Sequence, residues 1–234
     1  ISLGTSDTYF GAMDHCRVSE HGEGHVFGSP TGGYMTLVCF KNGSLARERV
    51  RDELGLDWAG FSRAIRETPP ALGGRGLVLP WYDPEITPRV LVPGVRRRGI
   101  EPGDPAMCRA VVEAQMMAMR LHTRWMEVRP ACIYATGGAS ANTEILHIMA
   151  DVHACPVHRF ETTASAALGA ALRAFHAAER AAGRPVDWPD VVRGFAEPVA
   201  GSRVDPQPEA VAAYNAMEPV YAAFEQEALR SMTA

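Results

Sequence analysis

The stretch Ala131-Cys132-Ile133-Tyr134-Ala135-Thr136-Gly137-Gly138-Ala139-Ser140-Ala141-Asn142 passes from an apolar run into a turn with two consecutive glycines. From here the sequence predicts, in order, a buried strand over Ala131–Ala135, a turn over Thr136–Ser140, a helix over Ala141–Val152, a strand over Pro156–Phe160 and a helix from Ala164 to about Arg180. Strands that alternate with helices in this way are typical of α/β proteins. Small residues surround Gly169 in the last helix, so we expect that helix to pack closely on the sheet.

The beginning of the chain has the composition of a β-hairpin. Ile1–Leu3 and Tyr9–Met13 flank the segment Gly4-Thr5-Ser6-Asp7-Thr8, and a second extended pair is expected over Gly24–Phe27 and Tyr34–Phe40. Backbone N–H groups and hydroxyls in such a turn can bind a phosphate. Glycine, serine, threonine and aspartate are also the ordinary residues of any hairpin turn, so this segment alone favours a structural role.

Further helices are expected on both sides of a region rich in glycine and proline. The first is capped by Ser44, has Leu45, Val50 and Leu54 on its apolar face and ends at Gly55; the second covers Trp58–Thr68 and is capped by Asp57. The third is a long helix over Asp104–Met126, with Pro105 in its first turn and Met116, Met117 and Met119 in the core. A closing helix is expected over about Glu209–Ser231. The region Pro69–Pro105 is expected to be irregular with short strands, and Arg96-Arg97-Arg98 within it to form a solvated loop.

Composition excludes several classes of protein. The 234 residues are 47% hydrophobic and 21% charged with a formal net charge of -4, which gives no electrostatic reason to expect nucleic acid or an anionic membrane as a partner. The five cysteines are scattered and odd in number, which favours reduced thiols in the cytoplasm over a disulfide framework. No apolar stretch is long enough to suggest a membrane span.

Two segments are candidates for ligand binding. Gly137 and Gly138 would let a ligand approach the backbone without interference from a Cβ atom, and the helix that follows would present free N–H groups to negative charge. The segment is neither a GxGxxG fingerprint nor a P-loop, and a plain strand-to-helix turn explains it equally well. His15, Cys16, His21 and His25 lie close together, but their spacing matches no familiar zinc finger, so we predict no metal site.

Taken together, Ser2–Thr8 and Thr136–Leu146 at this separation resemble the FGGY family of carbohydrate kinases, part of the actin, Hsp70 and hexokinase superfamily. Within the family the likeness is to the xylulose kinases, and it extends from Ile1 to about His176. Segments that also fit are Gly24–Phe27, Tyr34–Leu45, Glu85–Pro88 and Ala164–His176.

The resemblance implies a fold and an activity. It implies an α/β, ribonuclease-H-like ATPase domain with a mixed sheet flanked by helices, and makes residues 1–234 the C-terminal nucleotide-binding domain of a two-domain kinase. Such kinases hold the sugar mainly in the N-terminal domain and transfer the γ-phosphoryl group of ATP to D-xylulose. ATP or ADP, accompanied by Mg²⁺, is then the ligand expected for this chain.

The resemblance also assigns the site residues. Gly4, Thr5 and Ser6 match the phosphate-binding motif of the family. Gly137, Gly138, Ala139 and Asn142 match its adenosine motif. Trp58 matches a position that lines the nucleotide pocket, with a half-buried core tryptophan as the alternative.

The general base of the family falls outside this sequence. It is an aspartate in a Gly-Asp-Asn type segment, expected upstream of Ile1, so no catalytic residue is assigned within the chain and the isolated chain is expected to be inactive. Because the domain that selects the sugar is also missing, a gluconate, ribulose or glycerol kinase remains an alternative within the family. A non-catalytic nucleotide-binding module is the alternative outside it.

Overall fold

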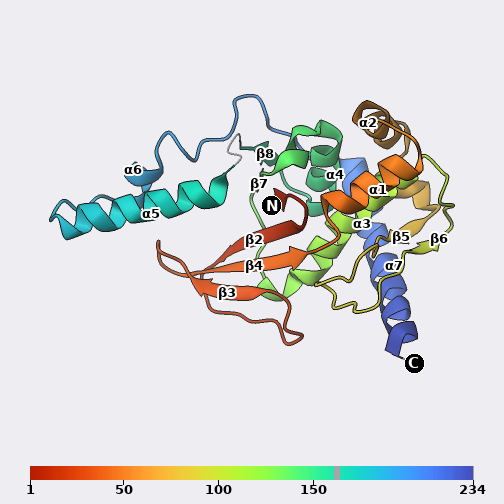
Figure 1. Ribbon diagram of the computed structural model, residues 1–234, viewed down its shortest axis with the longest axis horizontal. Coiled ribbons are helices and arrows are strands. Elements are labelled where there is room, and N and C mark those ends of the chain that lie inside the picture. The colour runs from red at the N-terminus through yellow and green to blue at the C-terminus, as the bar shows by residue number, and fades with distance from the viewer. Residues whose placement is uncertain (161–163, 234) are drawn as a thin grey trace.

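The computed structural model describes residues 1–160 and 164–233, and its N-terminal part is an antiparallel sheet (Figure 1). In spatial order the strands are β1 (Ser2–Leu3), β2 (Asp7–Met13), β4 (Tyr34–Phe40) and β3 (His25–Gly28). Side chains alternate along β2, so that Asp7, Tyr9 and Met13 are buried on one face. Both strand pairs expected from the sequence are confirmed.

A second pair of strands extends this sheet and makes it mixed. β7 (Ile133–Ala135) and β8 (Val157–Arg159) run parallel to each other. The N–H of Leu3 donates to the carbonyl of Thr136 at 2.8 Å, and the N–H of Thr136 donates to the carbonyl of Ile1 at 2.9 Å. These bonds place β1 beside β7 in parallel, in the order β8-β7-β1-β2-β4-β3. The expected mixed α/β sheet is therefore confirmed.

Four of the helices pack around α3. The helical elements are α1 (Ser44–Glu53), α2 (Trp58–Glu67), α3 (Met107–His122), α4 (Thr143–His153), α5 (Ser165–Ala181), α6 (Trp188–Val192) and α7 (Pro208–Thr233), with 3₁₀ turns η1 (Pro70–Gly74), η2 (Arg124–Met126) and η3 (Gly138–Ala141). Helices α1, α2, α4 and α7 all contact α3. Met116, Met117 and Met119 on α3 are fully buried, as predicted.

Two helix starts differ from the sequence prediction. The long helix begins at Met107 because Asp104 and Pro105 form a turn before it, in which the Asp104 carboxylate accepts from the N–H of Ala106 at 2.8 Å. The predicted cap Ser44 is the first residue of α1, and Gly43 is the N-cap. A Cβ atom on Gly43 would lie 2.7 Å from the backbone nitrogen of Asp7. Contact with the hairpin therefore requires glycine at the cap.

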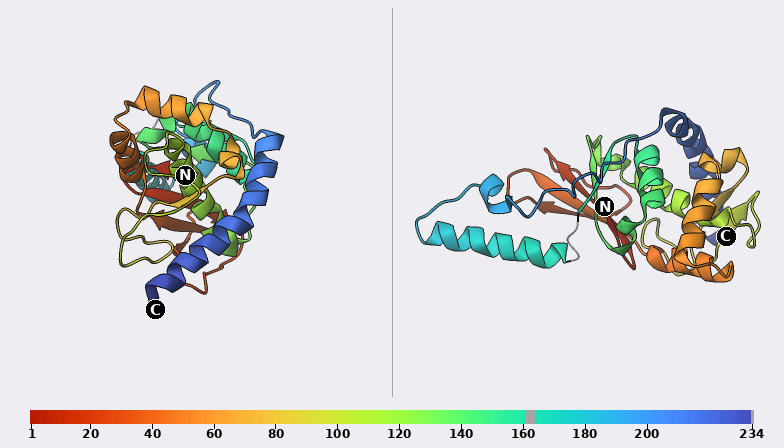
Figure 2. Two further views of the ribbon diagram at one scale, coloured as in Figure 1. Left: turned by 90° about the vertical axis from the view of Figure 1, so that its right-hand side faces the viewer. Right: turned by 90° about the horizontal axis from the view of Figure 1, so that it is seen from above.

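Helix α5 is where the prediction fails most clearly. Its side chains are largely exposed, and it extends with α6 away from the sheet (Figures 1 and 2). A Cβ atom on Gly169 would meet nothing within 4 Å among the described residues, so the expected close packing on the sheet is wrong. The ring of His176 instead stacks on Trp188 of α6 at 4.2 Å between centroids.

The arginine run is also ordered rather than a solvated loop. Residues Arg96–Arg98 form strand β6, which pairs antiparallel with β5 (Leu77–Leu79). The guanidinium group of Arg98 forms an ion pair with Glu227 of α7 at 2.6 Å. Pairing with a fully buried strand explains why three consecutive charges adopt extended structure here.

A buried histidine joins three distant parts of the chain. His122 on α3 contacts Glu23 through Nδ1 at 2.5 Å and Glu225 of α7 through Nε2 at 2.9 Å. Burial lowers the pKa of His122, but hydrogen bonds to Glu225 and Glu23 outweigh this effect and raise the pKa to about 9. At neutral pH the imidazolium therefore lies between two carboxylates.

This contact makes stability depend on pH. Because the folded pKa of about 9 exceeds the ordinary value of 6.5, the stabilisation is complete below pH 6.5 and is lost as the pH rises through 9. We expect the unfolding free energy of the native protein to exceed that of His122→Gln by up to about 3 kcal/mol at pH 6, and the difference to shrink by pH 10. Urea unfolding at both pH values measures it, with the exposed His15→Gln as control. A difference that is the same at both pH values would refute the assignment.

Candidate functional site

A cavity of about 710 Å³ lies between α1, α2 and the segment formed by η3 and the start of α4. Ser44 and Arg47 line it from α1, Trp58 and Ser62 from α2, and Gly138 from η3. Its volume falls within the range of about 300–1,000 Å³ that is typical of small-molecule sites.

The cavity brings together part of the predicted site. Its described lining includes Trp58, Gly138, Ala139 and Asn142. That lining does not include Gly137 or the hairpin residues 4–6. The distinction separates the residues that could touch a ligand in this cavity from those that shape or adjoin it.

The two consecutive glycines have different roles. Gly137 has a φ of 85°, and a Cβ atom there would lie 2.4 Å from the carbonyl oxygen of Leu3. Glycine at this position is therefore required for β1 to approach the turn. A Cβ atom on Gly138, in contrast, would meet nothing within 4 Å among the described atoms. The space in front of Gly138 is the cavity itself.

Asn142 ties two walls of the cavity together. As N-cap of α4, its side-chain oxygen accepts from the N–H of Glu144 at 3.0 Å and of Ile145 at 3.4 Å. Its amide nitrogen donates to the hydroxyl of Ser62 on α2 at 2.9 Å. An amide NH₂ has two hydrogens, so one more donor can face a ligand. The sequence pattern predicts a helix start at Ala141, whereas α4 begins at Thr143 with Asn142 as its cap.

Trp58 presents a ring to solvent at the first turn of α2. Its side chain is 43% exposed, and the edge-to-face contact with Phe61 and the guanidinium of Arg51, 4.4 Å from the ring centroid, hold it in place. The predicted cap is confirmed, because the Asp57 carboxylate accepts from the N–H of Gly60 at 2.7 Å. The arrangement offers an aromatic surface on which a planar base can stack.

The hairpin adjoins this cavity. Thr5 is exposed at its tip, and the carbonyl of Gly4 accepts from the N–H of Ser44, a cavity-lining residue, at 2.9 Å. The turn that contains Gly137 and Gly138 also lies next to the hairpin, because β7, which precedes this turn, is the neighbour of β1 in the sheet. Two turns far apart in sequence thus meet at the ends of two neighbouring parallel strands.

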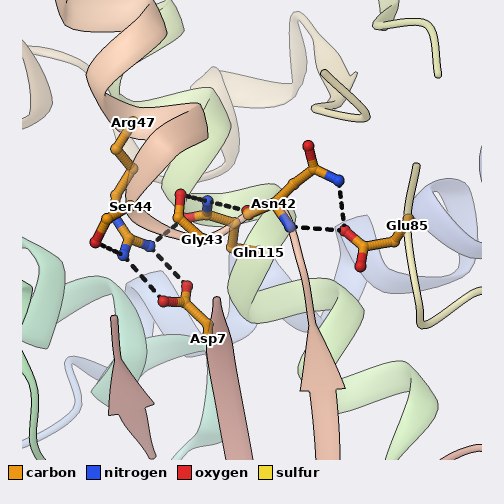
Figure 3. Close-up of polar contacts among 7 residues, drawn as sticks. All are labelled: Asp7, Asn42, Gly43, Ser44, Arg47, Glu85 and Gln115. Atoms are coloured by element: carbon orange, nitrogen blue, oxygen red, sulfur yellow. Dashed lines mark hydrogen bonds and ion pairs between the residues drawn. The ribbon is translucent and has the colours of Figure 1, made fainter. Parts of the chain in front are cut away.

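A buried polar network behind the hairpin was missed entirely (Figure 3). Arg47 of α1 pairs with Asp7 of β2 at 2.7 Å, and both side chains are 1% exposed. Burial raises the pKa of Asp7, and the Arg47 charge opposes that rise. The alternation of β2, which puts Asp7 on the face of Tyr9, was the signal that could have revealed a buried carboxylate.

Among residues 1–160 and 164–233, no group of three or more His, Cys, Asp or Glu side chains could hold a metal ion. Within the same ranges the thiols of all five cysteines are free. Across this part of the chain, every helix is too short or too polar to traverse a bilayer.

Comparison with known proteins gives one consistent family. The sequence model described as "FGGY family of carbohydrate kinases, C-terminal domain" matches residues 1–178. The xylulose kinase of Mus musculus is 40% identical over 243 residues, which cover 98% of this chain and 42% of that protein. The chain thus spans less than half the length of this curated relative.

Solved structures agree in fold. The xylulose kinase of Rhodospirillum rubrum matches 100% of this chain and 47% of its own chain with a TM-score of 0.81 and 20% identity. The gluconate kinase of Lactobacillus acidophilus matches 97% of this chain and 46% of its own with a TM-score of 0.82 and 19% identity. Similarity at this level shows the fold and does not identify the sugar substrate.

Proposed function

Because this chain belongs to the FGGY family of carbohydrate kinases, we propose that residues 1–234 are the nucleotide-binding C-terminal domain of an ATP-dependent sugar kinase. The observation that supports this most directly is the cavity in which Trp58, Gly138 and Asn142 meet beside the hairpin. We further propose a cytoplasmic protein, because its cysteines are free and lack the pattern of a disulfide framework.

The cavity and the hairpin suggest how ATP would lie. The adenine would stack on the exposed ring of Trp58, and the adenosine would pass Gly138, where a side chain is absent, within reach of the spare amide hydrogen of Asn142. The phosphates would then run past Ser44 to the hairpin, where Thr5 and Ser6 offer hydroxyl donors to the γ-phosphate. Mg²⁺ bound to the phosphates would supply charge neutralisation.

Catalysis would then depend on how the reactants and the hydrogen-bond donors are positioned relative to one another. Phosphoryl transfer is accelerated mainly by in-line placement of the reactants and by donors aimed at the transferring oxygens. The chain's own residues would hold the nucleotide and its γ-phosphate. The sugar and the base that accepts its hydroxyl proton would be supplied by the remainder of the full-length protein, so this chain alone would be inactive.

We propose D-xylulose as the sugar, on the strength of the 40% identical relative named xylulose kinase. The comparable fold similarity to a gluconate kinase makes gluconate the second candidate. ADP release by the full-length protein with ATP, Mg²⁺ and either D-xylulose or gluconate distinguishes them. Turnover with neither sugar would contradict both of these substrate assignments.

The Gly138→Val substitution tests the nucleotide site. Open space around the added side chain leaves the fold intact, but the isopropyl group would enter the volume proposed for the adenosine. We expect ADP binding to weaken by about 1–3 kcal/mol, measured by titration calorimetry on the full-length protein. Gly103→Val is the matched control, because Gly103 is also exposed with open space around it but lies outside the cavity lining. Equal ADP affinity in both variants would exclude this cavity.

A further inference from the structure

Arg47 is buried at the point where the hairpin, α1 and α3 meet (Figure 3). Its Nη1 donates to Asp7 Oδ2 at 2.7 Å and to Gln115 Oε1 at 2.6 Å. Its Nη2 donates to Asp7 Oδ1 at 3.0 Å and to the hydroxyl of Ser44 at 3.0 Å. The terminal nitrogens of a guanidinium carry four hydrogens, so these contacts use all of them.

The partners of Arg47 fix the hairpin from behind. Asp7 is the first residue of β2 and directly follows the Gly4-Thr5-Ser6 turn. The side-chain amide of Gln115 donates to the carbonyls of Asn42 and Gly43 at 2.7 Å and 3.0 Å. Gly43 in turn packs against the backbone of the hairpin, where a Cβ atom would lie 2.8 Å from the carbonyl of Thr5.

The turn that precedes α1 is held from its other side as well. The carboxylate of Glu85 accepts from the backbone N–H groups of Lys41 at 2.5 Å and Asn42 at 3.1 Å, and from the Asn42 side chain at 2.8 Å. These hydrogen bonds fix the start of α1. Because Arg47 is part of α1 and bonds Asp7, the position of the hairpin is fixed relative to this helix.

Arg47 also lines the cavity, next to Ser44. It thus contacts both the wall of the nucleotide cavity and the strand that carries the hairpin. We propose that Arg47 is a positioning residue that holds the hairpin at the correct distance from the nucleotide cavity. This inference rests on the proposed function and adds a residue that neither turn motif contains.

Lysine cannot replace arginine in this role. An ammonium group is a compact point charge with three donors, whereas the planar guanidinium meets both oxygens of one carboxylate and two further acceptors at once. Arg47→Lys keeps the buried charge beside Asp7 but loses this geometry. It therefore separates the effect of charge from the effect of position.

The experiment uses the full-length protein and compares Arg47→Lys with Arg49→Lys. Arg49 is on the same helix, but its side chain is exposed and pairs with Asp83 at 3.2 Å rather than with a residue of the hairpin. We expect Arg47→Lys to lower kcat by about 10- to 100-fold, because small displacements of a positioned group have effects of this size. ADP affinity should change far less than kcat because ADP lacks the γ-phosphate, and Arg49→Lys should leave both unchanged.

Two results would overturn the proposal. One is an Arg47→Lys protein with a lower melting temperature and a native kcat per folded molecule, which would make the role of Arg47 structural. The other, should Arg47→Lys fail to fold, is a native kcat in the uncharged pair Asp7→Asn with Arg47→Met. A full-length native protein that neither binds ADP nor phosphorylates a sugar refutes the proposed function instead, and with it the basis of this inference.

Discussion

Thr5→Ala in the full-length protein should lower kcat by about 10²–10³, the usual effect of removing one donor aimed at developing charge. Thr5 is exposed at the tip of the hairpin, and the carbonyl of its neighbour Gly4 is bonded to the cavity-lining Ser44. If its hydroxyl donates to the γ-phosphate, the loss falls on phosphoryl transfer. ADP affinity should change little, because the γ-phosphate is absent from ADP.

The matched control is Thr8→Ala. Thr8 lies in the same hairpin, but its hydroxyl is 4.0 Å from the sulfur of Cys39 on β4, within the sheet. We expect Thr8→Ala to change kcat little. Steady-state kinetics and a thermal melt on the same preparation give both quantities. If Thr5→Ala is stable and turns over at the native rate, the hairpin does not bind the γ-phosphate.

Arg109→Met should destabilise the protein by about 3–5 kcal/mol, the usual result of breaking a buried ion pair from one side. Arg109 Nε donates to the fully buried Glu113 at 2.6 Å, and its Nη2 donates to the hydroxyl of Tyr214 at 2.7 Å. Burial raises the pKa of Glu113, and the Arg109 charge is the largest effect opposing that rise. Without Arg109 the Glu113 carboxylate must either stay ionised in the interior with no positive charge beside it or bind a proton.

Urea unfolding followed by circular dichroism measures this loss. The double variant Arg109→Met with Glu113→Leu should recover most of it, because no unpaired charge is left. Arg203→Met is the surface control: Arg203 pairs with Asp205 in solvent, where an ion pair contributes little to stability. If Arg109→Met and Arg203→Met lower the free energy of unfolding equally, the buried ion pair contributes no more to stability than the exposed one.

The sequence predicts those features that depend on local pattern. The turn residues and the apolar runs that flank them predict β2 and β4, and the Asp57 cap and the stop at Gly55 follow from chemistry within one turn. The sequence does not predict that β1 and β7 are neighbours, because this pairing joins residues far apart in the chain and leaves no local signal.

The failures have a common cause in contacts between distant residues. Ser44 is the better cap by propensity, but the approach of Asp7 requires glycine at position 43. Arg47 resembles a surface residue of an amphipathic helix, yet the carboxylate of Asp7 allows it to be buried. Gly137 and Gly138 are the same residue type side by side, and they differ through the fold: Gly137 has a positive φ and lies against the carbonyl of Leu3, whereas Gly138 does neither.

The parallel pairing of β1 with β7 also bears on the order in which the protein is made. The backbone nitrogen of Ile1 donates to the carbonyl of Tyr134, a residue 133 positions later in the chain. During synthesis on the ribosome, β1 can therefore pair with β7 only after β7 has emerged. Closing the long loop between these two strands is expected to be a slow step. The hairpin can form early, while the cavity beside it is completed only after both parts have met. A nucleotide that binds this cavity would stabilise only the finished domain, and would act on the last stage of its folding.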